Sequence, residues 1–175
     1  RTGIKSRKVA VEETSTDLAE TASRKALGWT DGGYAERTIK PEDIDLIVFA
    51  TVTPDVLVPS NAAILRRRLG LENAACFDLN AACSGFVYAL TVAESMIVAS
   101  ATASNRSDFK RALVVAGERP SRITNWADRN TCVLLGDGAG AVVLEYDPSR
   151  AGILSTFIAN EDDIHNSLTC PMPLD

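Results

Sequence analysis

Short apolar runs alternate with stretches of helical periodicity along this chain. Continuous, mostly apolar runs at Leu46–Thr51, Ala74–Leu79 and Ala112–Gly117 are typical of strands that a sheet buries on both faces. Between them, apolar residues recur at helical spacing up to about Leu27 and again from Ser60 to Leu69. Strands that alternate with helices predict an α/β sandwich with a mixed sheet.

Local signals predict where the first helices begin and end. Thr14 and Asp17 form the pattern of a capping box at the start of the first helix. Ser60 is expected to cap the second helix, and Gly70 to end it. Pro41–Asp43 predicts a short turn of helix. The remaining segments are predicted as an extended or hairpin start (Arg1–Val11), a loop (Gly28–Arg37), a long irregular loop (Glu118–Thr131) and strands (Cys132–Leu135, Ala139–Tyr146, Gly152–Ile158).

One cysteine lies where a predicted core strand turns into a long apolar helix. The stretch Asn80–Phe86 has the sequence NAACSGF, and Ser84–Ala101 contains a single charged residue, which predicts a helix buried on most faces. Small neighbours leave the sulfur of Cys83 accessible, and the N–H groups at a helix start favour thiolate over thiol. Cys83 is therefore either a nucleophile in the cysteine counterpart of a serine nucleophile elbow or, like most free cysteines, a small buried hydrophobe.

Composition narrows the class of protein. The 175 residues are 46% hydrophobic with a net charge of −5, which fits one α/β domain and argues against a general nucleic-acid binder. No signal peptide and no membrane span are predicted. The four cysteines show neither a CxxC pair nor metal-ligand spacing, so reduced thiols in the cytoplasm are expected and no metal. The single histidine, His165, is interpreted as part of a surface loop.

Two further motifs have structural interpretations. Gly136–Gly140 has the sequence GDGAG, but strand-like residues follow it, whereas a dinucleotide fingerprint requires a helix there. The glycines are therefore expected to permit close backbone approach beside the cysteine. Arg66–Arg68 is interpreted as a solvated helix end; steering of an acidic carrier protein is the alternative.

The NAACSGF stretch, preceded by FDL, resembles the active-site segment of β-ketoacyl-acyl-carrier-protein synthase III, a branch of the thiolase-like condensing enzymes. The resemblance covers nearly the whole chain and favours the nucleophile interpretation. It implies a thiolase-like layered sandwich built from two similar halves, of which residues 1–175 are expected to be the N-terminal half without the family's opening strand. Five other stretches agree in the same order: RTGI (Arg1–Ile4), PEDIDLIVFATVTPD (Pro41–Asp55), VPS (Val58–Ser60), WADRNT (Trp126–Thr131) and GDGAGAVVLE (Gly136–Glu145).

The resemblance implies a reaction. Cys83 would take an acyl group from acyl-coenzyme A, and malonyl on acyl carrier protein would lose carbon dioxide and attack the acyl-cysteine, in fatty acid or polyketide synthesis. Acyl-coenzyme A is a substrate, and no cofactor is expected. The family's histidine and asparagine motifs do not occur in this chain, so these 175 residues alone are expected not to condense. A related acyltransferase to an alcohol or amine, and a non-catalytic scaffold half, remain as alternatives.

The resemblance also implies roles for individual residues. Arg1, Trp126 and Arg129 match positions at the coenzyme A entrance, where guanidinium pairs with phosphate and stacks on adenine. Val58 and Leu135 match the acyl pocket, and Val58 is expected to reach the neighbouring subunit's pocket across a homodimer. The alternative interpretations are that Arg1 and Arg129 are solvated surface residues and that Val58 packs within its loop. The starter acyl group cannot be predicted.

Overall fold

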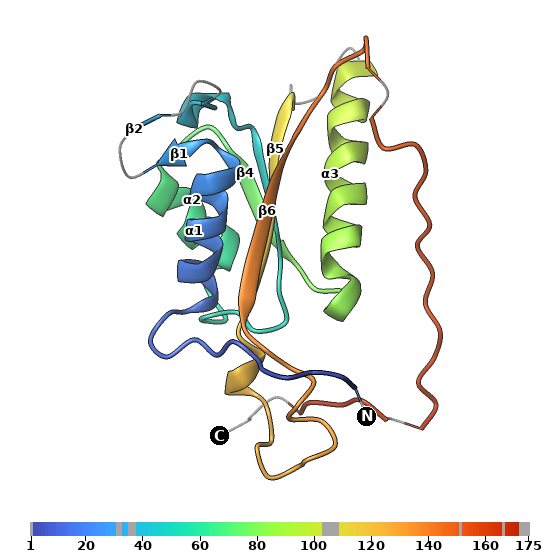
Figure 1. Ribbon diagram of the computed structural model, residues 1–175. Coiled ribbons are helices and arrows are strands. Elements are labelled where there is room, and N and C mark those ends of the chain that lie inside the picture. Colours follow the sequence, from blue (N-terminus) through green and yellow to red (C-terminus); the bar gives the residue numbers. More distant parts are fainter. Residues whose placement is uncertain are drawn as a thin grey trace.

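The computed structural model describes residues 2–30, 33–34, 38–102, 109–150, 152–165 and 167–171. Within these ranges a four-stranded sheet lies between two layers of helix, α1 and α2 on one face and α3 on the other (Figure 1). The helices are α1 (Ser15–Ala26), α2 (Asn61–Leu69) and α3 (Gly85–Thr102). The strands of the sheet are β3 (Leu46–Ala50), β4 (Ala75–Leu79), β5 (Arg111–Glu118) and β6 (Gly138–Glu145). Shorter elements are β1 (Trp29–Thr30), β2 (Gly33–Tyr34), η1 (Pro41–Asp43), η2 (Ala82–Ser84) and η3 (Pro120–Arg122).

The sheet is mixed, as the sequence predicts. Its order is β4-β3-β5-β6, with β3 parallel to both of its neighbours and β6 antiparallel to β5. Val48 at the centre of β3 faces Phe77 on one side and Val114 on the other. The carboxyl ends of β3, β4 and β5 therefore meet at one edge of the sheet, which is where α/β proteins place their sites.

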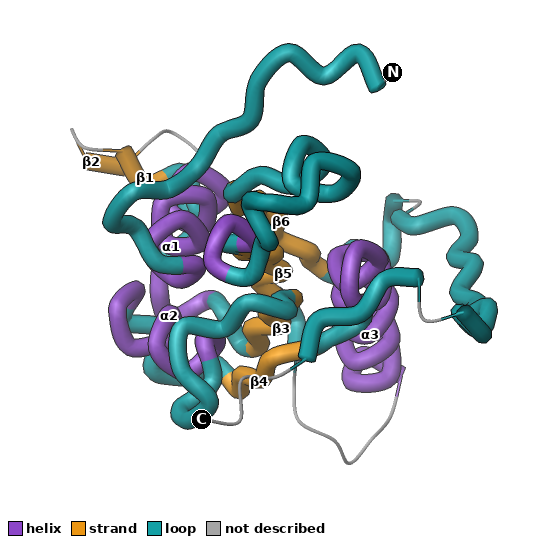
Figure 2. The backbone as a smooth tube through the Cα atoms, turned by 90° about the horizontal axis from the view of Figure 1, so that it is seen from below, coloured by secondary structure: helices purple, strands orange, loops and turns teal. Residues whose placement is uncertain are grey.

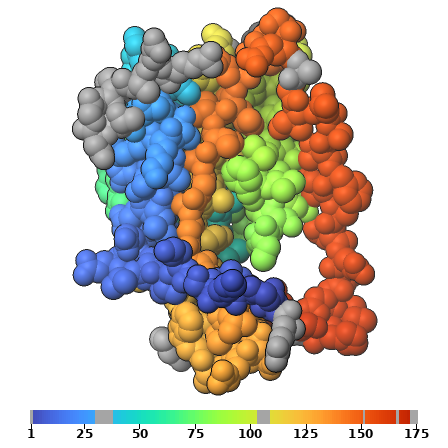
Figure 3. Space-filling model, in the orientation of Figure 1, coloured from blue at the N-terminus to red at the C-terminus, as the bar shows by residue number. Residues whose placement is uncertain are grey.

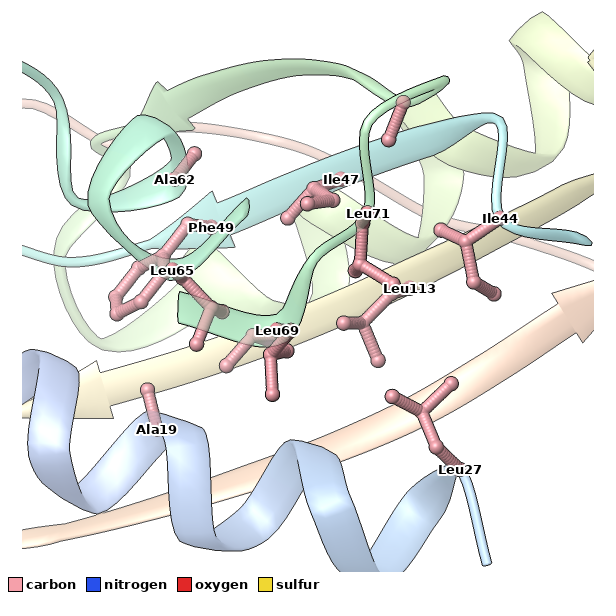
Figure 4. Close-up of a cluster of buried hydrophobic side chains, with 12 residues drawn as sticks. Ala19, Leu27, Ile44, Ile47, Phe49, Ala62, Leu65, Leu69, Leu71 and Leu113 are labelled. Carbon is pink, nitrogen blue, oxygen red and sulfur yellow. The ribbon is translucent and has the colours of Figure 1, made fainter. Parts of the chain in front are cut away.

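The core has two parts, one on each face of the sheet. All five residues of β3 are buried, and successive side chains point to opposite faces. Phe49 packs with Leu65 and Leu113 beneath α1 and α2 (Figure 4). Val48 packs on the other face, with Ala89 and Ala93 of α3 among its neighbours in that cluster. Burial on both faces explains why this strand has a continuous apolar sequence.

The predicted helix ends are confirmed. Thr14 and Asp17 form both hydrogen bonds of a capping box at the start of α1. The Ser60 hydroxyl accepts a hydrogen bond from the Ala63 amide, and Gly70 ends α2 in the left-handed conformation at φ +65°. These are local devices, so sequence alone is enough to place them.

Two apolar elements are more exposed than the sequence predicts. Beta strand β4 lies at the outer edge of the described sheet, and its residues are partly exposed. Helix α3 buries one stripe at a spacing of four residues (Gly85, Ala89, Ala93 and Ile97), not most of its faces. Together with η2, residues 82–102 are also apolar and long enough to cross a membrane, which the sequence prediction overlooked. One such helix is weak evidence, because core helices share these properties.

Three segments differ from their predicted conformation. Cys132–Leu135 forms turns, because the Cys132 amide donates to the Asp128 carbonyl and the Leu134 amide to that of Thr131. Gly152–Ile158 runs without strand pairing, since apolar β-formers need a partner strand to become one. The predicted loop after α1 contains the short antiparallel pair β1 and β2. Residues 2–11 are extended without the alternative hairpin.

Candidate active site

Cys83 lies in a tight turn between β4 and α3. It belongs to η2, and α3 begins two residues later, so the predicted strand-to-helix turn is confirmed. Ala82 has a left-handed backbone at φ +47°, which is uncommon for a residue with a side chain. The Ala82 amide donates to Asn80 Oδ1 at 3.3 Å, and the Ser84 amide donates to the Ala81 carbonyl at 3.1 Å. The turn presents Cys83 to solvent, so the buried-hydrophobe alternative is wrong.

Gly85 allows this turn to sit close to the sheet. It is buried, and a Cβ atom placed there would lie 3.2 Å from the Cβ of Ala50 at the end of β3. A side chain at this position would push the start of α3 away from the carboxyl end of β3. The glycine after Cys83 therefore sets the distance between the thiol-bearing turn and the sheet.

The other cysteines lie in different surroundings. Cys76 is half-buried in β4; burial raises the pKa of its thiol, Arg66 opposes that shift and Asp78 adds to it. Cys132 is half-buried and Cys170 is exposed. All four cysteines are free, as predicted. Exposure distinguishes Cys83 from the two cysteines in the predicted apolar runs.

Carboxylates hold the loop after β3. Glu118 accepts hydrogen bonds from the Val52 amide at 2.9 Å and the Thr53 hydroxyl at 2.6 Å. Asp55 accepts from the first amides of α1, at 2.9 Å and 3.2 Å, while its own amide donates to Asn61 Oδ1. These bonds close the base of the loop.

The tip of the same loop is apolar and exposed. Leu57 and Val58 are each 81% exposed, so Val58 does not pack within its own loop. The alternative interpretation, that Val58 only packs within its loop, is therefore wrong. Its role at an acyl pocket stays a prediction.

The segment from Arg119 to Asp137, here called the entrance loop, carries the predicted coenzyme A contacts. Its middle is ordered by Asp128, which accepts hydrogen bonds from the Asn130 amide at 3.0 Å and the Thr131 hydroxyl at 2.5 Å. These bonds hold the pKa of Asp128 below its usual value. Trp126 and Arg129, on either side of Asp128, are both exposed.

The entrance loop, in gold, and the start of α3 lie at the same end of the molecule (Figure 1). Figure 2 views the sheet from that end, with α1 and α2 on one side and α3 on the other. The structure thus brings Trp126 and Arg129 to the end that presents Cys83. Leu135 is 37% exposed in the same loop. Arg1 lies outside the described residues.

The glycine motif at the end of the entrance loop has a narrower role than predicted. A Cβ at Gly136 would lie 3.1 Å from Arg7 Cδ and 3.2 Å from the Lys8 carbonyl, so this glycine permits close approach of the N-terminal segment. Gly138 and Gly140 have nothing within 4 Å of such an atom, so the expectation of a close approach beside the cysteine fails for them.

The remaining charged candidates have structural or surface roles. Arg66 Nε donates to the Ala74 carbonyl at 2.8 Å, and Arg68 pairs with Asp17 at 2.5 Å. Arg67 and Arg68 are exposed, as expected for a solvated helix end, although Arg66 and Arg68 also form bonds within the chain. His165 lies in an exposed turn, as predicted. Within the described ranges no cluster of side chains fits a metal ion.

Sequence reasoning missed the carboxylates that fasten the loops around Cys83, namely Asp55, Glu118 and Asp137. Asp137 directly precedes β6 and Glu118 ends β5, whereas Asp55 lies in the loop that follows β3, next to Pro54. An acidic residue at the boundary of a strand is a weak signal for such a role, because its donors come from segments far away in sequence.

Comparison with known proteins finds similar enzymes. Residues 77–161 match the family described as 3-oxoacyl-[acyl-carrier-protein (ACP)] synthase III. The chain is 48% identical over 172 residues to β-ketoacyl-[acyl-carrier-protein] synthase III of Thioalkalivibrio sulfidiphilus, covering 98% of this chain and 49% of that protein. The enzyme of the same name from Clostridium acetobutylicum is 42% identical over 171 residues, covering 98% of this chain and 48% of its own length.

A solved structure agrees with the sequence relatives. The crystal structure of 3-oxoacyl-[acyl-carrier-protein] synthase III from Aquifex aeolicus matches with a TM-score of 0.74 at 42% identity, over 85% of this chain and 44% of that one. The chain spans about half the length of the curated relatives it matches. In sequence and in its thiolase-like α/β fold, this chain is similar to the β-ketoacyl-acyl-carrier-protein synthase III enzymes.

Proposed function

We propose that Cys83 is the nucleophile of a β-ketoacyl-acyl-carrier-protein synthase III that acts in fatty acid synthesis. The observation that carries the proposal is an exposed thiol on a strained turn at the start of α3, in a chain similar to these enzymes. Strained turns of this kind expose a nucleophile at the edge of a sheet.

The reaction divides into two transfers. The thiolate of Cys83 attacks the carbonyl carbon of acyl-coenzyme A, the thioester bond breaks, and coenzyme A leaves as its thiolate. Malonyl on acyl carrier protein then loses carbon dioxide, and its carbanion attacks the acyl-cysteine. The new carbon–carbon bond forms as the Cys83 thiolate leaves, which gives a β-ketoacyl product. The family's histidine and asparagine motifs are not among these 175 residues, so we expect the first transfer but not the second from this chain alone.

Residues around the turn fit the two ends of the first substrate. Trp126 and Arg129 on the entrance loop offer an indole and a guanidinium for adenine and phosphate, and Arg1 is proposed to join them. Val58 and Leu135 are proposed to line the acyl end. Substrate would then span from the entrance loop to Cys83.

We also propose a homodimer. Strand β4 pairs with β3 on one side, and within the described part of the chain its other edge has no strand partner. Pairing of that edge with its twin would join two sheets and cover it. The exposed Leu57 and Val58 would then meet the neighbouring subunit. We propose that the assembled enzyme is soluble and cytoplasmic.

Acylation of Cys83 tests the proposal. The purified protein is incubated with acetyl-coenzyme A, and the covalent adduct is located by intact mass spectrometry and peptide mapping. We expect one acyl group on Cys83, none in Cys83→Ser, and normal acylation in the matched control Cys170→Ser, which removes the other exposed thiol.

The product assay then separates the candidate reactions. With malonyl-acyl-carrier protein, the complete enzyme is expected to form a β-ketoacyl product. Transfer to an alcohol or amine instead would indicate the related acyltransferase. Absence of any acyl adduct would indicate the scaffold and refute the proposal.

A further inference from the structure

One carboxylate joins three segments that are distant in the sequence. Asp137 Oδ2 accepts a hydrogen bond from the Ala10 amide at 2.8 Å and from the Ser121 hydroxyl at 2.6 Å. Its Oδ1 accepts from the Ser121 amide at 2.9 Å, and its own amide donates to the Lys8 carbonyl at 2.8 Å. Bonds to an ionised carboxylate are about twice as strong as neutral ones.

These contacts close the base of the entrance loop. Asp137 and Ser121 lie at its two ends, so their bonds hold both ends together while Trp126 and Arg129 project from the middle. Loops with joined ends are compact and hold their side chains in place.

The same carboxylate fastens the N-terminal segment, residues 2–11, across the loop. Arg119 adds hydrogen bonds to the Ala10 and Val11 carbonyls at 3.3 Å and 2.9 Å, and Arg7 donates to the Leu134 carbonyl at 3.2 Å. Figure 3 shows this segment, in dark blue, lying across the gold entrance loop.

We propose that Asp137 is a positioning residue for coenzyme A, because it holds the entrance loop and the N-terminal segment in one arrangement at the mouth of the site. The inference rests on the proposed function and deepens it. Cys83 itself is held by separate bonds within residues 79–85, and in the described structure no hydrogen bond links that turn to Asp137. Loss of the Asp137 carboxylate should therefore disturb binding of the nucleotide end and leave the thiol in place.

The electrostatics of the carboxylate agree with this geometry. Burial pushes the pKa of Asp137 upward, but the hydrogen bonds from Ser121 and Ala10, together with Arg119, outweigh burial and hold it below its usual value. Asp137 is thus ionised at neutral pH, and its carboxylate accepts three hydrogen bonds, one from the Ala10 amide and two from Ser121. An asparagine there keeps the shape but replaces an acceptor by a donor that faces N–H groups.

Two substrates distinguish a role of Asp137 in positioning coenzyme A from a general disturbance of the active site. Acetyl-coenzyme A has the nucleotide, whereas the acetyl thioester of N-acetylcysteamine has only the acyl end. Acyl-cysteine formation is a single turnover, so its rate is followed against substrate concentration, and the half-saturating concentration and the limiting rate serve as KM and kcat. Both are measured for each substrate in wild type, Asp137→Asn and the matched control Asp147→Asn. Asp147 accepts hydrogen bonds from Ser149 in the same way, but in an exposed turn at the far end of β6.

For Asp137→Asn we expect KM for acetyl-coenzyme A to rise about tenfold, with kcat and KM for the short thioester within about twofold. Asp147→Asn should match wild type on both substrates. Ser121→Ala, which removes one donor only, should change KM in the same direction by about threefold, and it serves if Asp137→Asn does not fold.

An equal rise in KM for both substrates, or no rise for either, would overturn the inference. Failure of the wild-type protein to form any acyl-cysteine would instead overturn the proposed function. The two failures are therefore distinguishable in one experiment.

Discussion

Gly117 gives the sharpest test of how the sheet and α1 fit together. It lies near the end of β5 and is buried. A Cβ atom there would lie 2.8 Å from the Ser15 carbonyl oxygen, 2.9 Å from Phe49 Cζ and 3.1 Å from Ala19 Cβ. Two of these neighbours belong to α1, and Phe49 is fully buried in the core. An alanine at this position cannot be accommodated without moving a helix or an aromatic ring.

The size of the effect follows from two opposing terms. Inserting a methyl group into a packed core costs roughly 1–3 kcal/mol. Alanine also lowers the conformational entropy of the unfolded chain, which stabilises the folded state by about 0.5–1 kcal/mol. Because one of the clashes is with backbone that cannot rotate away, we expect the upper part of the first range and a net loss of about 2 kcal/mol. For a chain of this length that loss lowers Tm by about 4–8 °C.

Urea unfolding monitored by circular dichroism measures this loss. Gly117→Ala should lower the midpoint while the slope with urea concentration stays unchanged. Gly140→Ala is the matched control, because Gly140 pairs with Ala116 on the neighbouring strand and has nothing within 4 Å of an added Cβ. It should be as stable as wild type or slightly more stable. If Gly117→Ala unfolds at the wild-type midpoint, or if both variants lose the same stability, the close approach of α1 to β5 is wrong.

Three further outcomes are expected. In a Cys170→Ser background, limiting iodoacetamide should label Cys83 well before Cys76, because Cys83 is exposed whereas burial raises the pKa of the Cys76 thiol. Preferential labelling of Cys76 would contradict the turn geometry. Val58→Phe in the complete enzyme should raise the ratio of kcat/KM for acetyl-coenzyme A to that for longer acyl-coenzyme A by an order of magnitude or more, since each buried methylene is worth roughly 0.8 kcal/mol. An unchanged ratio would exclude Val58 as the residue that limits acyl-chain length. The pKa of Asp137 is lowered in the folded state, so the stability that its ionised carboxylate contributes is complete above the ordinary value of 3.8 and is lost as the pH falls below it. Asp137→Asn should therefore lose less stability than wild type between neutral and acid pH. An identical pH profile would refute the ionised contacts.

Features that depend on near neighbours in the chain could be predicted from the sequence alone. The capping box at Thr14, the cap at Ser60 and the stop at Gly70 each act within four residues, so their residue types are sufficient to predict them. The core strand β3 was recognisable because burial on both faces requires a continuous apolar run. The position of Cys83 between a strand and a helix followed from the same local patterns.

The pairing of segments that are distant in the sequence required the tertiary structure. Gly152–Ile158 has the composition of a strand, but no strand of the described sheet pairs with it. The carboxylates of Asp55 and Asp137 bind amides about 40 and 127 residues away, and Gly117 owes its importance to a helix that is 102 positions distant at Ser15. Such contacts depend on how elements pack in space, and packing distances are not encoded in any local window of residues. The position of the proposed nucleophile was therefore predictable from the sequence, whereas the hydrogen bonds that hold the loops around it were not.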